Sequence, residues 1–544
     1  MENCKNSNVY SYELNANIPR LFSLFDNNPI SPSYGEGDRF HWAWKLIDFG
    51  NGTFQGAANG LARLRMTELL PDRMDPEAID QRIASCFIGA EYLRRPNGSM
   101  EETFPYESSF CVTALVAYDL LTSIELQGNL LNRGERDERL KIVAPMIHFL
   151  HRADEQHAFI SNHLATAAGA LYKWHHLTGE KGEERGRSIL NRILKHQSEE
   201  GWFEEYGGAD PGYQSLCTYY LADLHRLRPD LNLGPSLHRS IRFLWHFAHP
   251  DGSFGGIYGS RQTRFYYPAG IEYLAKECPE ASALAAFMRN SIVNQTTVTL
   301  SAMDAPNLVP MFNVYAWAGA LCRPGSGQKA TGEDLCLPAF KESYRAAFPQ
   351  AGLYVRSDKA GYNIVNVAKG GVLFNYDRAT GCAEVNGGVV VQDPKGHYFS
   401  TQALRPGRKV EIYSDRMVVT SLLYATRGQQ PKPWQFLIFR LLNLTVMRSL
   451  WFGNLLKRLL VLLMITGGRS LKSTVQRTIT WGLNGPEITD QWKLAKGEDL
   501  TPIEVRGNFS TIHMASQGYW QKQDDLIKMV NPNKPRKSIS HDPV

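Results

Sequence analysis

Two short segments, about fifty residues apart, carry the side chains best suited to chemistry on an acidic ligand. Residues 161–165 include Asn162 and His163, and residues 210–214 include Tyr213. An amide and an imidazole can donate hydrogen bonds to a developing oxyanion, and a phenol can carry a proton. Together these groups can neutralise a carboxylate and move a proton beside it. That chemistry suits a sugar acid better than a phosphate or a peptide.

The elements that must position these side chains form an imperfect repeat over residues 1–325. Glycine turns at Gly52, Gly98, Gly201 and Gly252 each precede an amphipathic segment. Helices are predicted over residues 110–123, 162–177, 216–227, 268–276 and 308–321. Spacings of roughly fifty residues match an array of helical hairpins, which bury their apolar faces only by stacking on neighbours. Closed into a ring, the array is an α/α toroid with its turn residues at one mouth.

A second domain is predicted after a linker at residues 326–345, because the hydrophobic period changes from helical to strand-like. Glycine turns separate the apparent strands. The fold class expected is therefore α+β and multidomain, with the toroid followed by an antiparallel β-sandwich over residues 346–515. Residues 516–544 are predicted to be a polar, basic tail, of which residues 531–537 are predicted to be disordered. Strands are predicted over residues 353–356, 362–367, 371–376, 388–392, 416–423, 478–481 and 488–492.

Residues 433–468 interrupt the predicted sheet with a basic, apolar insertion. Its longest uncharged run, residues 459–468, is shorter than the ~20 residues that a membrane span needs. One interpretation is a helix lying on an anionic membrane surface, with Trp434 and Trp451 at the interface. The other is a helical layer packed on the sandwich or a dimer contact. The cations that punctuate the insertion are Arg440, Arg448, Lys457 and Arg458.

Composition narrows the function classes. The 544 residues carry a net charge of +5, which is compatible with a polyanionic partner but too small for a nucleic-acid-binding footprint. The eight cysteines form no Cys-x-x-Cys pair, so free buried thiols are expected rather than disulfides or a zinc site. The N-terminus has no apolar signal region. We expect a cytoplasmic protein, peripheral at the membrane if the insertion binds lipid, that needs no cofactor.

Two segments resemble a known family. Asn162 and His163 resemble the Asn-His helix start of heparinase II/III-like polysaccharide lyases and related alginate lyases, and residues 205–213 resemble the later segment in which a Tyr opens a helix. The resemblance implies an enzyme that removes the C5 proton of a uronic acid in a polysaccharide and cleaves by β-elimination. Asn162 and His163 would offset charge on the carboxylate, and Tyr213 would act as base or as acid toward O4.

The sequence departs from that family at two places. Gln214 stands where the family commonly has His, so a second proton carrier, if the reaction needs one, must come from elsewhere. Tyr266 and Tyr267 follow the next glycine turn and are expected at the same mouth, with Tyr267 assigned to catalysis and His397 as an alternative carrier. Residues 369–375 contain no histidine where the family often has a metal motif, so no metal is expected.

Further contacts to substrate are predicted around the mouth. Arg261 and Arg264 have the planar fork that binds a carboxylate bidentately. Simpler interpretations exist for each residue: Asn162 is a good helix cap, His163 and the arginines are solvated, and the tyrosines pack. The full set of predicted substrate contacts is Tyr106, Glu107, Tyr206, Gln214, Arg261, Arg264, Tyr266 and His397.

Three functions remain open at this point. The first is a lyase on an acidic polysaccharide, and the second is a uronate C5-epimerase that shares its first step. The third is a catalytically weakened glycan-binding protein in membrane-associated polysaccharide assembly. A lyase generates an unsaturated uronate that absorbs in the ultraviolet, whereas a binding protein does not.

Overall fold

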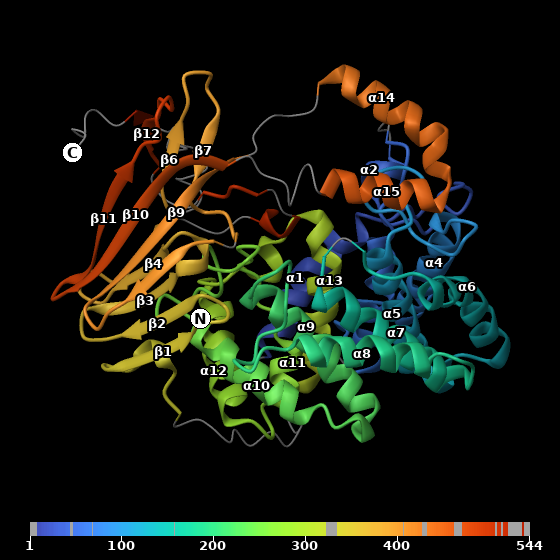
Figure 1. The fold of residues 1–544 in the computed structure, drawn as a ribbon. Coiled ribbons are helices and arrows are strands. Elements are labelled where there is room, and N and C mark those ends of the chain that lie inside the picture. The colour runs from blue at the N-terminus through green and yellow to red at the C-terminus, as the bar shows by residue number, and fades with distance from the viewer. Residues whose placement is uncertain are drawn as a thin grey trace.

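The structure is a computed structural model, and Figure 1 shows its fold. A helical domain is followed along the chain by two antiparallel sheets, and a helical hairpin projects from the second sheet. The predicted linker falls partly, and the predicted tail mostly, outside the described residues. These residues are 8–43, 47–67, 69–156, 158–322, 335–405, 407–426, 432–461, 470–505, 509–512, 515–519 and 536–537.

Six helices in the described part of the helical domain form a closed inner ring. Each packs on the next in chain order, and the last packs back on the first. They are buried on nearly every side, which explains their almost continuous apolar sequences. The inner helices are α3 (Ala57–Met66), α5 (Phe110–Gln127), α7 (Ser161–Thr178), α9 (Pro211–Leu227), α11 (Ala269–Leu274) and α13 (Ala305–Leu321).

A second layer of helices lies outside the ring, each packed on one inner helix. Because the chain alternates between the layers, successive inner helices run in the same direction. Their N-terminal ends therefore meet at one mouth of the toroid. The outer helices, in the order of the inner helices they cover, are α4 (Pro76–Leu93), α6 (Arg133–Arg152), α8 (Glu183–His196), α10 (Gly234–Leu244), α12 (Pro279–Asn294) and α1 (Val9–Phe22), and a short α2 (Arg39–Trp42) precedes the ring.

The strands form two sheets. The first has the order β1-β2-β3-β4-β5, and the second β11-β10-β9-β7-β6-β12-β13 with β8 on β9. All pairings are antiparallel. The strands are β1 (Tyr344–Phe348), β2 (Leu353–Ser357), β3 (Gly361–Asn366), β4 (Val372–Asp377), β5 (Cys382–Asn386), β6 (Val390–Gln392), β7 (Tyr398–Ser400), β8 (Lys409–Ile412), β9 (Arg416–Ala425), β10 (Ser470–Gly482), β11 (Gly485–Lys493), β12 (Thr501–Glu504) and β13 (Arg536–Lys537).

The central strand β3 of the first sheet is buried on both faces. Val365 of β3 faces the second sheet and shares a core with Val419 and Ile479. Tyr362 and Ile364, on the opposite face of the same strand, belong to the core of the toroid. The architecture is thus toroid, sheet and sheet in three layers (Figure 1). The fold class expected from the sequence is confirmed.

Two short helices leave the second sheet between β9 and β10. They are α14 (Pro433–Leu444) and α15 (Leu450–Val461), joined by the turn η9 (Val446–Arg448). Each has 12 residues in the described part of the chain, fewer than the ~20 that a bilayer span needs. The segment Phe110–Leu130 is long and apolar enough, but 78% of its most apolar stretch is buried, because α5 is an inner helix of the ring.

Candidate functional site

The predicted site begins at the start of α7. The backbone N–H and the side-chain Nδ2 of Asn162 each donate a 2.9 Å hydrogen bond to the two carboxylate oxygens of Glu205. The helix cap is Ile160, so the simpler interpretation of Asn162 as a cap is wrong. Glu205 lies in the connection between α8 and α9, and Ile160 pairs with it as an isolated β-bridge.

Glu205 is a functional candidate that the sequence analysis did not assign. Its side chain is fully buried, and burial raises the pKa of its carboxyl to about 7, although the hydrogen bonds from Asn162 act in the opposite direction. A carboxyl of this kind changes charge near neutral pH. The signal in the sequence was its place beside Tyr206 in the segment that resembles the lyases.

His163 lies beside Asn162 but has its own partner. Its Nδ1 is 2.8 Å from Oε2 of Glu155. Burial opposes the imidazolium form, but the neighbouring Cys111 sulfur and the Glu155 carboxylate outweigh it and raise the pKa of His163 well above its usual value. In its charged form His163 is a hydrogen-bond donor rather than a base.

Asp210 fixes the start of α9 to the loop that carries Arg261. Its Oδ1 accepts a hydrogen bond from the backbone N–H of Tyr213 (3.1 Å), as expected of an N-cap. Its Oδ2 accepts hydrogen bonds from the backbone N–H groups of Arg261 (2.8 Å) and Thr263 (3.3 Å). One carboxylate therefore holds Tyr213 and Arg261 at the same mouth of the toroid. The sequence predicted this placement because both residues follow a turn between helices.

Arg261 is the most unusual cation of this cluster. Its guanidinium carbon lies 3.8 Å from the ring centroid of Tyr206, and the residue is only 6% exposed. Its Nε has no hydrogen-bond partner, and among the described residues no carboxylate forms an ion pair with its side chain. Tyr206 itself has a left-handed backbone, with φ of 55°. A buried guanidinium without a carboxylate is suited to receive an anion.

The phenol of Tyr213 lies near this guanidinium. Burial raises the pKa of Tyr213 to about 12, although a hydrogen bond with Ser516 and the charge of Arg261 both lower it. Tyr267 is close to Tyr213, and burial raises the pKa of its phenol well above the usual value. At neutral pH both phenols are protonated.

The start of the predicted tail folds back over this mouth. Ser516, in the turn η11 (Ala515–Gln517), lies 3.2 Å from the hydroxyl of Thr263. The hydroxyl of Tyr519 accepts a 3.2 Å hydrogen bond from Nη1 of Arg264. Arg264 therefore contacts the chain's own C-terminal segment in the position where a substrate carboxylate was expected.

Two predicted residues are placed away from any ligand. Tyr266 is fully buried in the toroid core, with its ring 5.2 Å from that of Phe254, so it does not face the mouth as expected. Gln214 is fully buried as well, and its Nε2 donates to the carbonyl of Gly201 and the hydroxyl of Ser240. The expected substrate contacts of Tyr266 and Gln214 are corrected to structural roles, because neither side chain has surface to offer.

The remaining predicted residues lie outside the cluster of Arg261 and Tyr213. His397 is exposed in the β6–β7 turn, 3.0 Å from Asp393 of the same turn. Glu107 accepts a 2.6 Å hydrogen bond from the backbone of Thr103. Tyr106, with φ of 65°, lies below the guanidinium of Arg448 at 5.0 Å. Among the described residues, no group of three His, Cys, Asp or Glu is arranged to hold a metal ion.

Lys369, from the first turn after β3, supports the loop of Arg261 from the sandwich side. Its fully buried ammonium donates hydrogen bonds to the carbonyls of Ile257 (2.7 Å) and Gly259 (2.8 Å). Burial lowers the pKa of Lys369 to about 7. Lys369 is the first residue of the segment 369–375, where the family's metal motif is missing. In the structure it instead joins the sandwich to the helical domain through these two hydrogen bonds.

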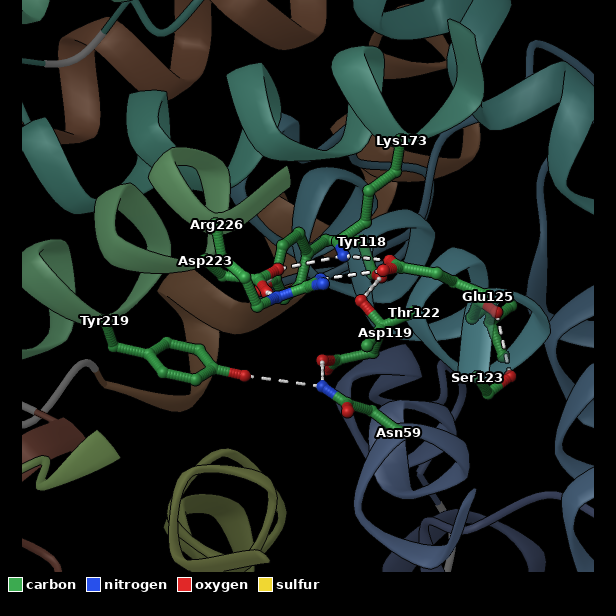
Figure 2. Close-up of polar contacts among 11 residues, drawn as sticks. Asn59, Tyr118, Asp119, Thr122, Ser123, Glu125, Lys173, Tyr219, Asp223 and Arg226 are labelled. Carbon is green, nitrogen blue, oxygen red and sulfur yellow. Dashed lines mark hydrogen bonds and ion pairs between the residues drawn. The ribbon is translucent and has the colours of Figure 1, made fainter. Parts of the chain in front are cut away.

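A second polar cluster lies further along the same inner helices, as Figure 2 shows. The ammonium of Lys173 lies 2.5 Å from Glu125 and 2.9 Å from Asp223, and Arg226 bonds both carboxylates at 2.7 and 2.9 Å. The hydroxyl of Tyr118 donates to Asp223 at 2.6 Å. These charges join α5, α7 and α9 in a fixed register, which non-directional apolar packing does not supply.

Asp119 lies beside this network but has no cation among its hydrogen-bond partners. Its Oδ1 accepts a 2.8 Å hydrogen bond from Nδ2 of Asn59, and burial raises its pKa to about 8. Nδ2 of Asn59 also lies 3.4 Å from the hydroxyl of Tyr219 (Figure 2). None of the residues of this polar cluster was singled out from the sequence, although a charged residue within an otherwise apolar inner helix is a usable signal.

The fold and site define a toroid-and-sandwich protein with a cationic, tyrosine-lined mouth. No family model matches the sequence, and no curated protein matches it significantly. Among solved structures, it is similar to a chondroitin AC lyase of Streptomyces coelicolor A3 (10% identity, 92% of this chain and 71% of that one, TM-score 0.45). It is also similar to heparinase III (12% identity, 78% of this chain and 75% of that one, TM-score 0.42).

A third similar structure is a family 76 glycoside hydrolase from a bovine Bacteroides thetaiotaomicron strain (8% identity, 58% of this chain and 78% of that one, TM-score 0.39). At such low identity and structural overlap, none of these likenesses carries a conclusion about activity. The fold class rests on the packing of the helices and strands themselves.

Proposed function

We propose that this protein acts on a uronic-acid-containing polysaccharide by C5 proton abstraction and β-elimination at the toroid mouth. The observation that carries the proposal is Arg261, a buried guanidinium with no carboxylate partner among the described residues, next to the protonated phenol of Tyr213. A uronate supplies both the missing carboxylate and an adjacent proton to be moved.

In the proposed reaction, Arg261 binds the C6 carboxylate of the sugar through its planar fork. In the small fraction of the protein whose Tyr213 phenol has first lost its proton to water, the phenolate takes the C5 proton, and the electron pair of the C5–H bond forms the C4–C5 double bond as the C4–O4 bond breaks. The phenol then returns its proton to O4. The charge of Arg261 offsets the negative charge that spreads into the carboxylate. The Asn162–Glu205 pair fixes the start of α7 beside this mouth.

One observation favours the second candidate, a glycan-binding protein with little or no turnover. The C-terminal segment contacts Tyr213 and Arg264 through Ser516 and Tyr519, so it occupies part of the proposed site. Gln214, which stands in place of a proton carrier, is locked in the core. A binding protein needs only the cationic mouth.

The first experiment is a screen of the full chain against heparosan, hyaluronan, chondroitin, alginate and bacterial acidic capsules. Appearance of ultraviolet absorbance from an unsaturated uronate supports elimination. Binding to one of these glycans without such absorbance favours the binding protein, and exchange of the C5 proton without cleavage favours an epimerase. If the protein neither binds nor turns over any of these acidic glycans, the proposal is refuted.

On a substrate that is cleaved, Tyr213→Phe removes the hydroxyl and keeps the ring. Turnover is expected to fall by about 10²–10⁴-fold, the usual contribution of general acid–base catalysis. The matched control is Tyr266→Phe, which removes a buried hydroxyl that has no hydrogen-bond partner among the described residues. Equal activity of Tyr213→Phe and Tyr266→Phe would remove Tyr213 from the mechanism.

The pH profile gives a separate check. The pKa of Tyr213 is about 12, so at any pH well below 12 each increase of one pH unit raises the phenolate fraction about tenfold. We expect kcat/KM to rise with pH between 7 and 9. A flat profile over that range would show that the phenol acts only as an acid and that another group takes the C5 proton.

A further inference from the structure

The helices α14 and α15 leave a large apolar surface uncovered. Trp434 is 56% exposed, Leu437 72%, Leu441 63% and Trp451 66%. Burying such side chains is a main source of folding free energy, and a soluble surface rarely groups so many of them. The earlier alternative of a layer packed against the sandwich is not what the structure shows, because Figure 1 places the hairpin away from both sheets. Also exposed on the hairpin are Phe436, Ile438, Leu444, Val446, Phe452, Leu455 and Leu459.

The polar side of the hairpin is fastened to the helical domain. Arg440 forms an ion pair with Asp48, and Arg458 donates a 2.8 Å hydrogen bond to Gln156. Phe439 packs edge-on against Phe104 at 5.4 Å. Together with Arg448 above Tyr106, these contacts hold the hairpin on loops that lead into inner helices. Three of the four cations expected to meet lipid thus anchor the hairpin, and its apolar side is left facing outward.

We propose that the apolar side of α14 and α15 inserts into the interface of an anionic lipid surface. The chain has no Asp or Glu between Asp415 and Glu487, so the hairpin's own charges are all positive, and Arg440, Arg448 and Arg458 stay exposed beside their anchoring contacts. A second copy of the chain would bring the same positive charge to a symmetric contact, whereas anionic headgroups complement it. Two exposed tryptophans suit the boundary between headgroups and acyl chains.

Docking of this kind has a consequence for the site. The hairpin rests on the loop of Phe104 and Tyr106, which leads directly into α5, one of the helices whose N-terminal ends form the mouth. A lipid-bound hairpin therefore holds the mouth at the membrane. The substrate would be an acidic glycan at or attached to that surface, a step that rests on the proposed function, whereas lipid docking does not.

The test is flotation of the full chain with vesicles of phosphatidylcholine, with and without phosphatidylglycerol. The decisive variant carries Trp434→Ser, Leu437→Ser, Leu441→Ser and Trp451→Ser. Each buried apolar side chain contributes about fivefold or more to partitioning, so the combined loss of vesicle binding is expected to exceed about 100-fold. Anionic vesicles are expected to bind the wild type about tenfold more tightly than neutral ones.

The matched controls are Leu483→Ser and Ile30→Ser, which remove apolar side chains that are 99% and 90% exposed elsewhere on the surface. They are expected to bind vesicles like the wild type. Wild type that does not float, or a fourfold variant that floats equally well, would overturn the proposal. So would a wild-type dimer that the variant converts to a monomer without any vesicle binding. None of these outcomes depends on whether a glycan is cleaved.

Discussion

Replacing Glu205 by Gln should change how the stability of the protein depends on pH. The carboxyl is fully buried, and its pKa is about 7 in the folded protein, against about 4.3 for an unperturbed Glu. Between these values the folded state holds a proton that the unfolded state has released. Because the folded pKa is the higher one, the stability from this group is fully present below pH 4 and is lost as pH rises through 7.

The size of the effect follows from the shift. A difference of about 2.7 pKa units corresponds to about 4 kcal/mol of unfolding free energy between pH 4 and pH 8. Glu205→Gln has no such proton to lose, so its contribution is constant with pH. Gln keeps one acceptor for the backbone N–H of Asn162, whereas its amide faces Nδ2 of Asn162 as a second donor. At pH 4.5 the protonated Glu205 carboxyl also offers one acceptor and one donor, so the variant and wild type are expected to have similar stability there.

The assay is urea unfolding of both proteins at several pH values from 4.5 to 8.5. The difference between them isolates Glu205, because every other titrating group is present in both. We expect the free-energy difference, wild type minus variant, to fall by about 2–4 kcal/mol across that range. A constant difference would mean that the pKa of Glu205 is not raised, and an increasing difference would mean that Asn162 holds it as a carboxylate with a lowered pKa.

Three further changes test other parts of the structure. Lys173→Met removes a buried ammonium between two carboxylates and is expected to lower the free energy of unfolding by urea by about 3–5 kcal/mol. Arg226→Met is expected to lower it less, because Arg226 is partly exposed. Equal losses would contradict the inference that Lys173 is the central cation of the network. Lys369→Met should abolish a gain in stability of up to about 4 kcal/mol as pH rises from 7 to 10, since the folded pKa of about 7 lies below the unfolded one; an unchanged pH slope would contradict burial of the ammonium. Truncation after residue 514 should increase nitration of Tyr213 by tetranitromethane, measured by peptide mass; unchanged nitration would show that the C-terminal segment does not cover the phenol.

The sequence by itself indicated five of the inner helices and the change from helices to strands, whereas the outer helices α1, α4, α6, α8, α10 and α12 were not predicted individually. Glycine turns followed by apolar helical segments recur along the first part of the chain, and such segments can bury their faces only against one another. The helical pattern placed Asn162 at a helix start, whereas only the resemblance placed Tyr213 at one. The helix α9 begins at Pro211 after its cap Asp210, five residues before the predicted start at 216. Because all inner helices run the same way, these starts had to meet at one mouth.

Tertiary structure alone decided which side chains in that mouth are available. Tyr266 and Tyr267 are adjacent in sequence, yet one points into the core and the other lies near Tyr213. Gln214 follows Tyr213 on α9, and the turn of the helix directs it into the interior. Helical periodicity assigns a face, but which face becomes a site depends on what packs against it from elsewhere in the chain.

The groups that shift pKa values come from distant segments, and no local pattern announces them. Glu205 approaches Asn162 from the next hairpin, Lys369 reaches the loop of Arg261 from the sandwich, and Ser516 reaches Tyr213 from the C-terminal segment. The sequence sets the helix and strand propensities and the hydrophobic period of each segment, and these signals act over a few neighbouring residues. Desolvation and long-range hydrogen bonds arise only when the chain closes into the ring and the sheet is pressed against it.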